Sequence, residues 1–175
     1  MKNLKIKSLK KIIYLFSFSA ILFASCDAEG VHTNYVGTWS AKVLVQENEI
    51  FIEYKDIVTL TEYSFTTIKQ ISVDDKWVNL VKLTGSFKVA ENKMTFNIAE
   101  AGISSLNQQS GKPTGEIIMY KSETDEYKSI LAQNAIATSY ISVYSITENQ
   151  LTLMTDKNEN GDYTDANETV VYTKQ

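Results

Sequence analysis

The sequence predicts an all-β fold, an antiparallel meander of short strands with one short helix. From residue 38 onward apolar and polar residues alternate, as they do through Trp39, Ala41 and Val43, which is the period of a strand with one buried face. β-branched and aromatic residues dominate these runs, and polar turns separate them at short intervals. Together with two matching hairpin patterns, this spacing indicates a sandwich or a barrel.

The expected strands follow one another at residues 38–46, 49–55, 56–61, 62–70, 77–89, 116–121, 138–147, 150–155 and 168–174. Within the fifth run, Trp77, Val81 and Phe87 share a parity, which predicts that they lie on one face of the sheet. Residues 99–116 hold three of the seven glycines and the only proline. We therefore expect a long loop there, of the kind that is often functional.

Two stretches follow one hairpin template. Residues 87–96 read FKVAENKMTF and residues 144–153 read YSITENQLTL. If Glu-Asn forms each tip, the facing pairs are Phe87–Phe96, Val89–Met94, Tyr144–Leu153 and Ile146–Leu151. All of these apolar side chains then share one face, whereas a slip of one residue would scatter them onto both faces. Asparagine at the tip tolerates the left-handed conformation that such turns require.

One segment has helical rather than strand-like spacing. In SETDEYKSILAQNAI, residues 122–136, four residues recur at helical intervals, namely Tyr127, Ile130, Leu131 and Ala135. Ser122 and Asp125 form a cap-like pair at its start. We expect a short helix here that packs against the sheet or closes one end of a barrel.

Residues 1–25 have the composition of a secretory signal peptide. Five lysines and no acidic residue lie within residues 1–11, and the apolar run IIYLFSFSAILFA follows at residues 12–24. A basic start, a short apolar run and small residues at its end are the parts of such a peptide. The run is shorter than the ~20 residues that span a bilayer. We therefore expect export and removal of residues 1–25.

Cys26 is the only cysteine, and it follows Phe23-Ala24-Ser25. This stretch resembles the lipobox of bacterial lipoproteins, in which the peptide is cleaved just before a cysteine that is then acylated. The resemblance implies a lipid anchor at Cys26 in the bacterial cell envelope, and we expect the outer membrane, on its periplasmic or its surface side. Two or three acyl chains give stable attachment where one is marginal. The alternative is ordinary secretion with a free thiol.

The chain that remains after cleavage is acidic and has the length of one domain. Residues 26–34 read as the acylated cysteine and a short tether, and residues 35–175 as the domain. Twelve lysines stand against twenty-one acidic residues, with no arginine, so the net charge is about −9. Nucleic acid requires a basic face and is therefore not the expected partner.

No pattern in the sequence indicates catalysis. The only histidine, His32, lies in the tether. The sequence contains no Gly-x-Ser-x-Gly motif, no phosphate-binding glycine loop and no histidine or cysteine cluster of the metal-binding kind. We therefore expect a protein that is not an enzyme and that needs no cofactor.

Residues 34–39 read NYVGTW. They resemble the Gly-x-Trp signature that opens the first strand of lipocalins and the wider calycin group, and Gly37 and Trp39 match it. The resemblance implies an eight-stranded up-and-down barrel over residues 35–175, in which Trp39 closes one end. In that family a late arginine stacks over the tryptophan. This chain has no arginine, and Lys174 could take its place.

A barrel of this kind implies an interior just large enough for side chains or one small ligand. The candidate pocket residues are Trp39, Val43, Phe87, Val89, Met94, Phe96, Tyr144, Ile146, Leu151 and Leu153. Two functions follow. The protein holds a small apolar ligand, or it is a filled barrel that acts on an envelope protein as a subunit, inhibitor or surface factor, through tyrosines such as Tyr120 or through the 99–116 loop.

Residues 156–168 read DKNENGDYTDANE and partly match a calcium-binding loop. The candidate ligands are Asp156, Asn158, Asn160, Asp162 and Asp165. The twelfth position, however, is Asn167, and Glu168 comes one residue late. Strand-like sequences flank the loop where a calcium loop of this type has helices. The departures favour a hairpin loop that Asn-Gly turns, with calcium binding as the alternative.

Overall fold

The computed structural model describes residues 33–47, 50–157, 160–163, 165 and 168–175. The expected signal peptide, Cys26 and the tether up to His32 lie outside the described residues, so those predictions stay predictions. Within the described ranges, no helix is both long enough and apolar enough to cross a membrane.

The described residues form a short 3₁₀ helix, nine strands and one α-helix. The helices are η1 (Thr33–Tyr35) and α1 (Asp125–Gln133). The strands are β1 (Gly37–Glu47), β2 (Ile50–Leu60), β3 (Ser64–Val73), β4 (Lys76–Ala90), β5 (Lys93–Leu106), β6 (Pro113–Lys121), β7 (Ser139–Ile146), β8 (Gln150–Thr155) and β9 (Thr169–Lys174). The two runs expected at 49–55 and 56–61 are one strand, β2.

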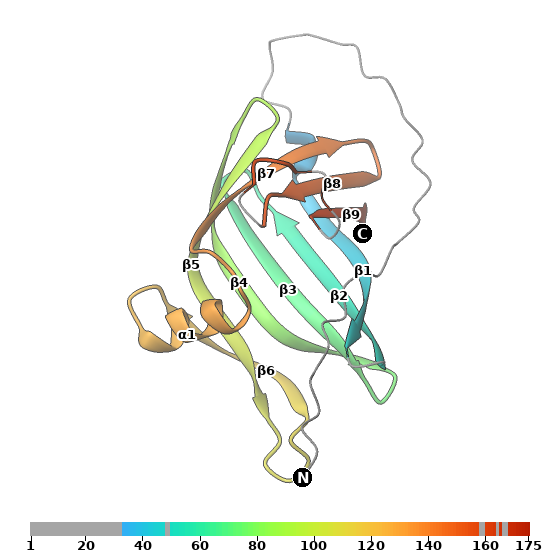
Figure 1. Ribbon diagram of the computed structural model, residues 1–175, viewed down its shortest axis with the longest axis vertical. Coiled ribbons are helices and arrows are strands. Elements are labelled where there is room, and N and C mark those ends of the chain that lie inside the picture. The colour runs from blue at the N-terminus through green and yellow to red at the C-terminus, as the bar shows by residue number, and fades with distance from the viewer. Residues whose placement is uncertain (1–32, 48–49, 158–159, 164, 166–167) are drawn as a thin grey trace, which may run out of the picture. The chain divides into compact units, whose positions relative to one another are not determined.

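Eight of the strands close into an antiparallel barrel. The hydrogen-bonded order runs β1-β2-β3-β4-β5-β7-β8-β9, and β9 pairs with β1 to complete the ring. Each pairing is antiparallel, and each strand is bonded to the next along the chain except around β6. The expected all-β meander, the barrel of eight strands and the short helix are confirmed (Figure 1).

The strand beside β5 is interrupted. β6 ends with Lys121 opposite Glu100 of β5, and β7 begins with Ser139 opposite Asn97 of the same strand. The chain between them leaves the barrel wall to form α1. β9 pairs with β1 only at Trp39 and Ser40. In the part of the chain that the structure describes, the barrel is therefore closed at the end near β7, β8 and β9 and split at the other (Figure 1).

Both predicted hairpins have the expected register. Phe87 pairs with Phe96 and Val89 with Met94 in the first, and the second has the two expected facing pairs as well. The tip of the first differs in one detail, because Glu91 rather than Asn92 takes the left-handed conformation, with φ +55°.

The expected loop at 99–116 is wrong, because β5 continues to Leu106 and β6 starts at Pro113. Gly102 explains the error. A Cβ atom there would lie 2.5 Å from Sδ of Met119 on β6, so glycine marks a close strand contact rather than a loop. The hydroxyl of Ser104 on β5 accepts the backbone N–H of Gly115 on β6 at 2.9 Å, which is a further bond between the two strands.

The predicted helix forms, with a different cap. Thr124, not the pair Ser122 and Asp125, is the N-cap, and its Oγ1 accepts the backbone N–H of Tyr127 at 3.2 Å. Tyr127, Ile130 and Leu131 are buried, as the helical spacing predicts, whereas Ala135 is exposed and lies beyond the end of α1 with φ +51°. The Tyr127 hydroxyl donates to the carbonyl of Ile98 at 2.8 Å, which ties α1 to β5.

Trp77 does not share a face with Val81, contrary to the parity prediction. Trp77 pairs with Ser72 of β3, whereas Val81 pairs with Lys69, and a bulge intervenes. The extra residue of a bulge turns the following side chains to the other face. The amino group of Lys42 lies 5.3 Å from the centre of the Trp77 ring.

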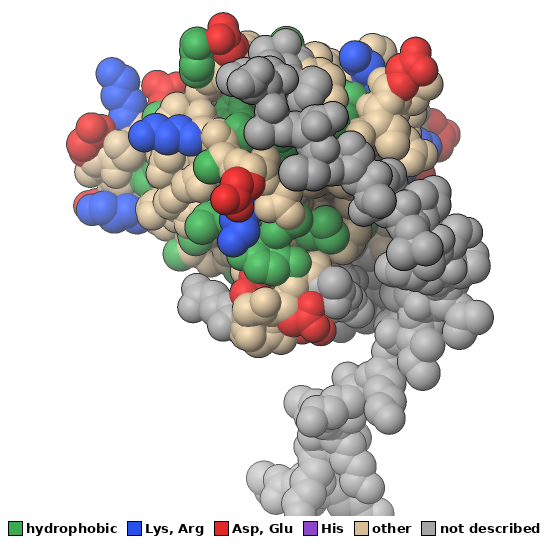
Figure 2. Space-filling model, turned by 90° about the horizontal axis from the view of Figure 1, so that it is seen from above, with side chains coloured by type: hydrophobic (Ala, Val, Ile, Leu, Met, Phe, Trp, Pro, Cys, Tyr) green, Lys and Arg blue, Asp and Glu red, His purple; other side chains and the backbone are tan. Residues whose placement is uncertain are grey.

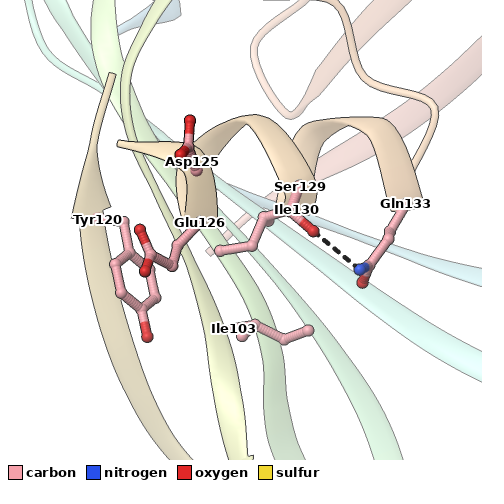
Figure 3. A pocket seen from close by; sticks show the side chains of 7 residues that line it. All are labelled: Ile103, Tyr120, Asp125, Glu126, Ser129, Ile130 and Gln133. Carbon is pink, nitrogen blue, oxygen red and sulfur yellow. Dashed lines mark hydrogen bonds between the residues drawn. The ribbon is translucent and has the colours of Figure 1, made fainter. Parts of the chain in front are cut away.

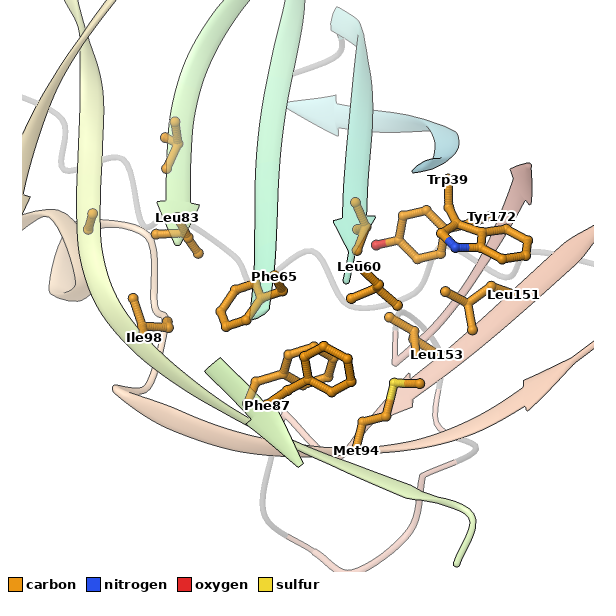
Figure 4. Close-up of a cluster of buried hydrophobic side chains, with 14 of the residues drawn as sticks. Trp39, Leu60, Phe65, Leu83, Phe87, Met94, Ile98, Leu151, Leu153 and Tyr172 are labelled. Carbon is orange, nitrogen blue, oxygen red and sulfur yellow. The ribbon is translucent and has the colours of Figure 1, made fainter. Parts of the chain in front are cut away.

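A packed apolar cluster fills the closed end of the barrel (Figure 4). Trp39, Met94 and Leu151 are fully buried within it. The Phe96 ring stacks on Phe87 at 5.6 Å between ring centres. The buried apolar side chains of the two neighbouring hairpins thus belong to one packed cluster, which excludes water from this end.

Candidate functional site

Beyond the packed end the barrel is hollow. A cavity of about 840 Å³ lies between the strands. Val58, Leu83, Phe96, Leu153 and Val170 form much of its apolar wall. The segment from Asn134 to Ala137, which leads from α1 to β7, and residues of the β8–β9 loop also line it. The cavity therefore lies where the interrupted strand and the short β8 and β9 leave the barrel wall incomplete.

The structure divides the ten sequence-derived pocket candidates between core and cavity. Phe96 and Leu153 line the cavity. Those fully within the buried cluster are Trp39, Phe87, Met94 and Leu151, and those packed against it while half-buried are Val89, Tyr144 and Ile146. Val43 is half-buried on β1. Most of the candidates thus belong to the floor beneath the cavity.

Asp56 is the most unusual group in the cavity wall. It lies on β2 between the inward-facing Tyr54 and Val58, opposite Ala41 on one side and Lys69 on the other. Its Oδ1 is shielded from solvent and has no hydrogen-bond partner among the described residues. Burial raises the pKa of the Asp56 carboxyl group, and the positive charges of Lys69 and Lys157 only partly offset this effect.

Two further ionisable groups respond to the same environment. Burial lowers the pKa of the Lys157 amino group, and the charge of Lys69 lowers it further. Burial raises the pKa of the Tyr172 hydroxyl, and the charge of Asp56 adds to this. Asp56 from β2, Lys69 from β3 and Tyr172 from β9 thus converge from different walls of the barrel on one polar region.

An aromatic stack connects this region with the packed floor. The ring of Tyr140 on β7 stacks on Phe96 at 5.0 Å with an interplanar angle of 19°. Burial raises the pKa of Tyr140 to about 12. The cavity therefore offers an apolar and aromatic surface on one side and charged groups on another.

Sequence reasoning missed Asp56 and Lys69, although their position carried a signal. Asp56 has the parity of Tyr54 and Val58, and Lys69 that of Phe65. A charged residue that continues an apolar parity set is placed on the inner face by the pleat. A division of β2 into two runs, 49–55 and 56–61, separates Asp56 from Tyr54 and so hides this signal.

Gly37 and Trp39 lie at the start of β1. The indole Nε1 of Trp39 donates to the carbonyl of Tyr35 at 2.8 Å, and the amino group of Lys174 lies 5.3 Å from the centre of the Trp39 ring. Gly37 has φ +142° and lies against both side chains. Lys174 thus occupies the place over the tryptophan that was expected from the sequence.

The β8–β9 loop uses its acidic groups to hold its own backbone. The Asp156 carboxylate accepts the backbone N–H groups of Asn160 and Gly161, at 3.1 and 2.8 Å. Oε1 of the buried Glu168 accepts the backbone N–H of Lys157 at 2.8 Å. Among the described residues, no three acidic, histidine or cysteine side chains are grouped as metal ligands would be. Asn158 lies outside the described residues, so calcium binding stays untested.

The other calcium candidates serve the same loop. Asn160 Nδ2 donates to Asp165 Oδ2 at 2.7 Å, and the backbone N–H of Asp162 donates to Asn160 Oδ1 at 2.7 Å.

A second, shallower hollow of about 410 Å³ lies beside α1. Figure 3 shows Tyr120 and Ile103 on their strands facing Ile130 of the helix. Gln133 donates to Ser129 at 3.0 Å along its rim. Because this hollow is open to solvent and carries acidic side chains on the helix, it suits an enclosed ligand less well than the larger cavity does.

Seen from the end at the top of Figure 1, acidic and basic side chains are scattered with hydrophobic ones between them (Figure 2). This view shows no concentrated basic surface.

No protein-family model matches the sequence, and no curated protein matches it either. The strand topology alone therefore supports the lipocalin-like barrel fold.

Proposed function

We propose that this protein is a lipid-anchored binding protein of the bacterial cell envelope whose barrel takes up a small, largely apolar ligand. One observation carries the proposal, the cavity of about 840 Å³ inside the barrel. Ligand sites occupy roughly 300–1,000 Å³ and are mostly apolar with a few polar groups. The cavity has that size and that composition, and a tightly packed floor supports it.

The anchor in this proposal is Cys26, acylated after removal of residues 1–25. The Ala24-Ser25-Cys26 sequence supports it, as does the basic and apolar stretch before it. Attachment to the outer membrane would hold the barrel close to a source of apolar molecules. The proposal involves ligand binding without catalysis, cofactor or nucleic acid.

Native mass spectrometry of the purified chain tests the ligand. We expect extra mass of a few hundred daltons that extraction with organic solvent removes. A bare mass in every preparation, together with no binding of an added apolar dye, would contradict the proposal. That result would turn the search toward the filled-barrel alternative and a protein partner recovered by crosslinking in the envelope.

Replacement of Cys26 by serine tests the anchor separately. In cells fed a labelled fatty acid, we expect the label in the wild-type chain and none in Cys26→Ser, and we expect only the wild type to sediment with membranes. Labelling that survives the substitution would contradict acylation at Cys26, without affecting the ligand proposal.

A further inference from the structure

We infer that the cavity selects an amphiphile whose buried end is a non-anionic hydrogen-bond donor, a hydroxyl or an amine, and that Asp56 receives it. The inference rests on the proposed function and adds the ligand's chemical class. It starts from the position of Asp56, which faces the interior from the middle of β2 and lines the cavity.

A buried acceptor without a partner is costly to a protein. Asp56 Oδ1 has none among the described residues, and leaving such a group unsatisfied costs about as much as a hydrogen bond contributes, or more. Since the two carboxylate oxygens exchange by rotation about a soft torsion, a donor in the cavity can be reached by either. A ligand donor would therefore satisfy a group that the protein leaves open.

The other acidic groups at the cavity are already engaged with the backbone. Asp156 accepts the N–H groups of Asn160 and Gly161, and Glu168 accepts the N–H of Lys157. These bonds hold the β8–β9 loop in place. Asp56 lies instead on β2, and its Oδ1 has no hydrogen-bond partner among the described residues.

The charge around the cavity determines which donors fit. Three acidic residues and two lysines line it, namely Asp56, Asp156, Glu168, Lys69 and Lys157. Their formal sum is one negative charge. A carboxylate ligand would meet this excess at short range in a poorly solvated space, where like charges repel strongly. A neutral or cationic head avoids that repulsion.

The remainder of the cavity suits the apolar body of such a ligand. Phe96 and Tyr140 present stacked rings, and Leu83, Leu153 and Val58 extend the apolar wall. A head group at Asp56 would therefore leave the tail against this surface, where its burial contributes roughly 25 cal/mol per Å².

A displacement experiment on the full chain tests the inference. The fluorescent apolar probe N-phenyl-1-naphthylamine is bound first and then displaced by decylamine, 1-decanol or decanoate, which share one chain length and differ in head group. At neutral pH we expect decylamine and 1-decanol to displace the probe at lower concentrations than decanoate, by on the order of tenfold for the charge-assisted bond of the amine.

Two variants assign the preference to Asp56. In Asp56→Asn, which keeps the shape and loses the charge, the ratio of decanoate to decylamine half-displacement concentrations should fall by on the order of tenfold. Glu53→Gln is the matched control, because Glu53 lies on the same strand and pairs with Lys42 at 3.1 Å, where both side chains are solvent-exposed. The ratio should be unchanged in this variant.

The possible failures are distinguishable. If the probe does not bind the wild-type chain, the proposed ligand-binding function fails and the inference fails with it. If the probe binds but decanoate competes as well as decylamine, or if Asp56→Asn leaves the ratio unchanged, the inference is overturned and the ligand-binding function stands. An equal fall in Glu53→Gln would also overturn it, because any loss of negative charge would then suffice.

Discussion

The two ends of the barrel interior are built on opposite principles. The closed end is filled with apolar and aromatic side chains, with Trp39, Met94 and Leu151 fully buried and Phe87 stacked on Phe96. The cavity beyond it carries Asp56, and burial raises the pKa of that carboxyl group. The closed end is filled with side chains. The cavity is hollow, and Asp56 Oδ1 in its wall has no hydrogen-bond partner among the described residues.

The packed end stabilises this fold, whereas the cavity wall contains a group whose burial reduces stability. Packed apolar clusters supply stability through burial. Buried charges reduce stability unless they are paired, and proteins usually retain such groups at functional sites. We therefore expect substitutions at the closed end to destabilise the barrel, and a substitution at Asp56 to do the reverse.

The largest effect is expected for Trp39→Ala. The variant removes a fully buried ring and its bond to the Tyr35 carbonyl, and large-to-small core changes of this kind cost about 3–5 kcal/mol. Equilibrium denaturation in urea measures the loss. The control is Leu44→Ala on the same strand, 53% exposed, for which we expect a change within about 0.5 kcal/mol. Similar losses in both variants would contradict a core at this end.

Glu168→Ala should have the next largest effect. Glu168 is 3% exposed, and its carboxylate accepts the Lys157 N–H at 2.8 Å. Loss of the acceptor leaves that donor unpaired, at a cost of about 1–2 kcal/mol. Glu168→Gln retains an acceptor and should lose less. Thermal unfolding of the two variants separates them, and equal losses would show that the hydrogen bond is not what stabilises the loop.

Asp56→Asn should stabilise the protein at neutral pH, by about 1 kcal/mol, because it replaces a buried charge by a neutral group of the same shape. Lys69, Lys157 and Tyr172 face Asp56 from β3, the β8–β9 loop and β9. Urea denaturation at neutral pH measures the gain, and a loss of stability would mean that the two lysines outweigh burial.

The same variant has a predictable pH dependence. Because the folded-state pKa of Asp56 is raised above its ordinary 3.8, the unfolded chain loses this proton first as the pH increases. The wild type therefore loses stability between pH 3.8 and the raised value, and the penalty persists above it. The advantage of Asp56→Asn should be present at neutral pH and vanish at pH values below 3.8. A constant difference across this range would contradict the assignment.

The smallest effect concerns Lys174. Its amino group lies 5.3 Å from the centre of the Trp39 ring, and an exposed cation–π contact contributes about 0.5–1 kcal/mol. Lys174→Met should lose roughly that amount. Lys174→Arg should retain or slightly increase stability, because the planar guanidinium group stacks on an aromatic ring. Thermal melts of the two variants rank them, and a stable Lys174→Met would show that the contact contributes nothing.

Much of the fold could be predicted because its signals are local. The two hairpins have the predicted partners, such as Phe87 with Phe96, since a tight turn and a period of two determine register over a few residues. The segment 99–116 could not be predicted in this way. Glycines such as Gly102 give this segment the composition of a loop. The close approach of Met119, from another strand, is what requires glycine at this position.

The candidate site was less predictable than the fold. The sequence indicated an apolar interior, and Phe96 and Leu153 do line the cavity. The cavity itself depends on where the barrel wall is interrupted, between Lys121 and Ser139. Asp56 and Lys69 had the right parity, but only the closed barrel brings them toward Lys157 and Tyr172.

The strand alternation, the two hairpins and the short helix follow from the amino-acid sequence, because each depends on residues that are neighbours in the chain. Other features follow only from the closed barrel. It placed Lys174 over Trp39, turned Trp77 away from Val81 through a bulge, and left a hollow beside Asp56. These features depend on contacts between segments that are far apart in the chain, and a local sequence pattern does not specify such contacts.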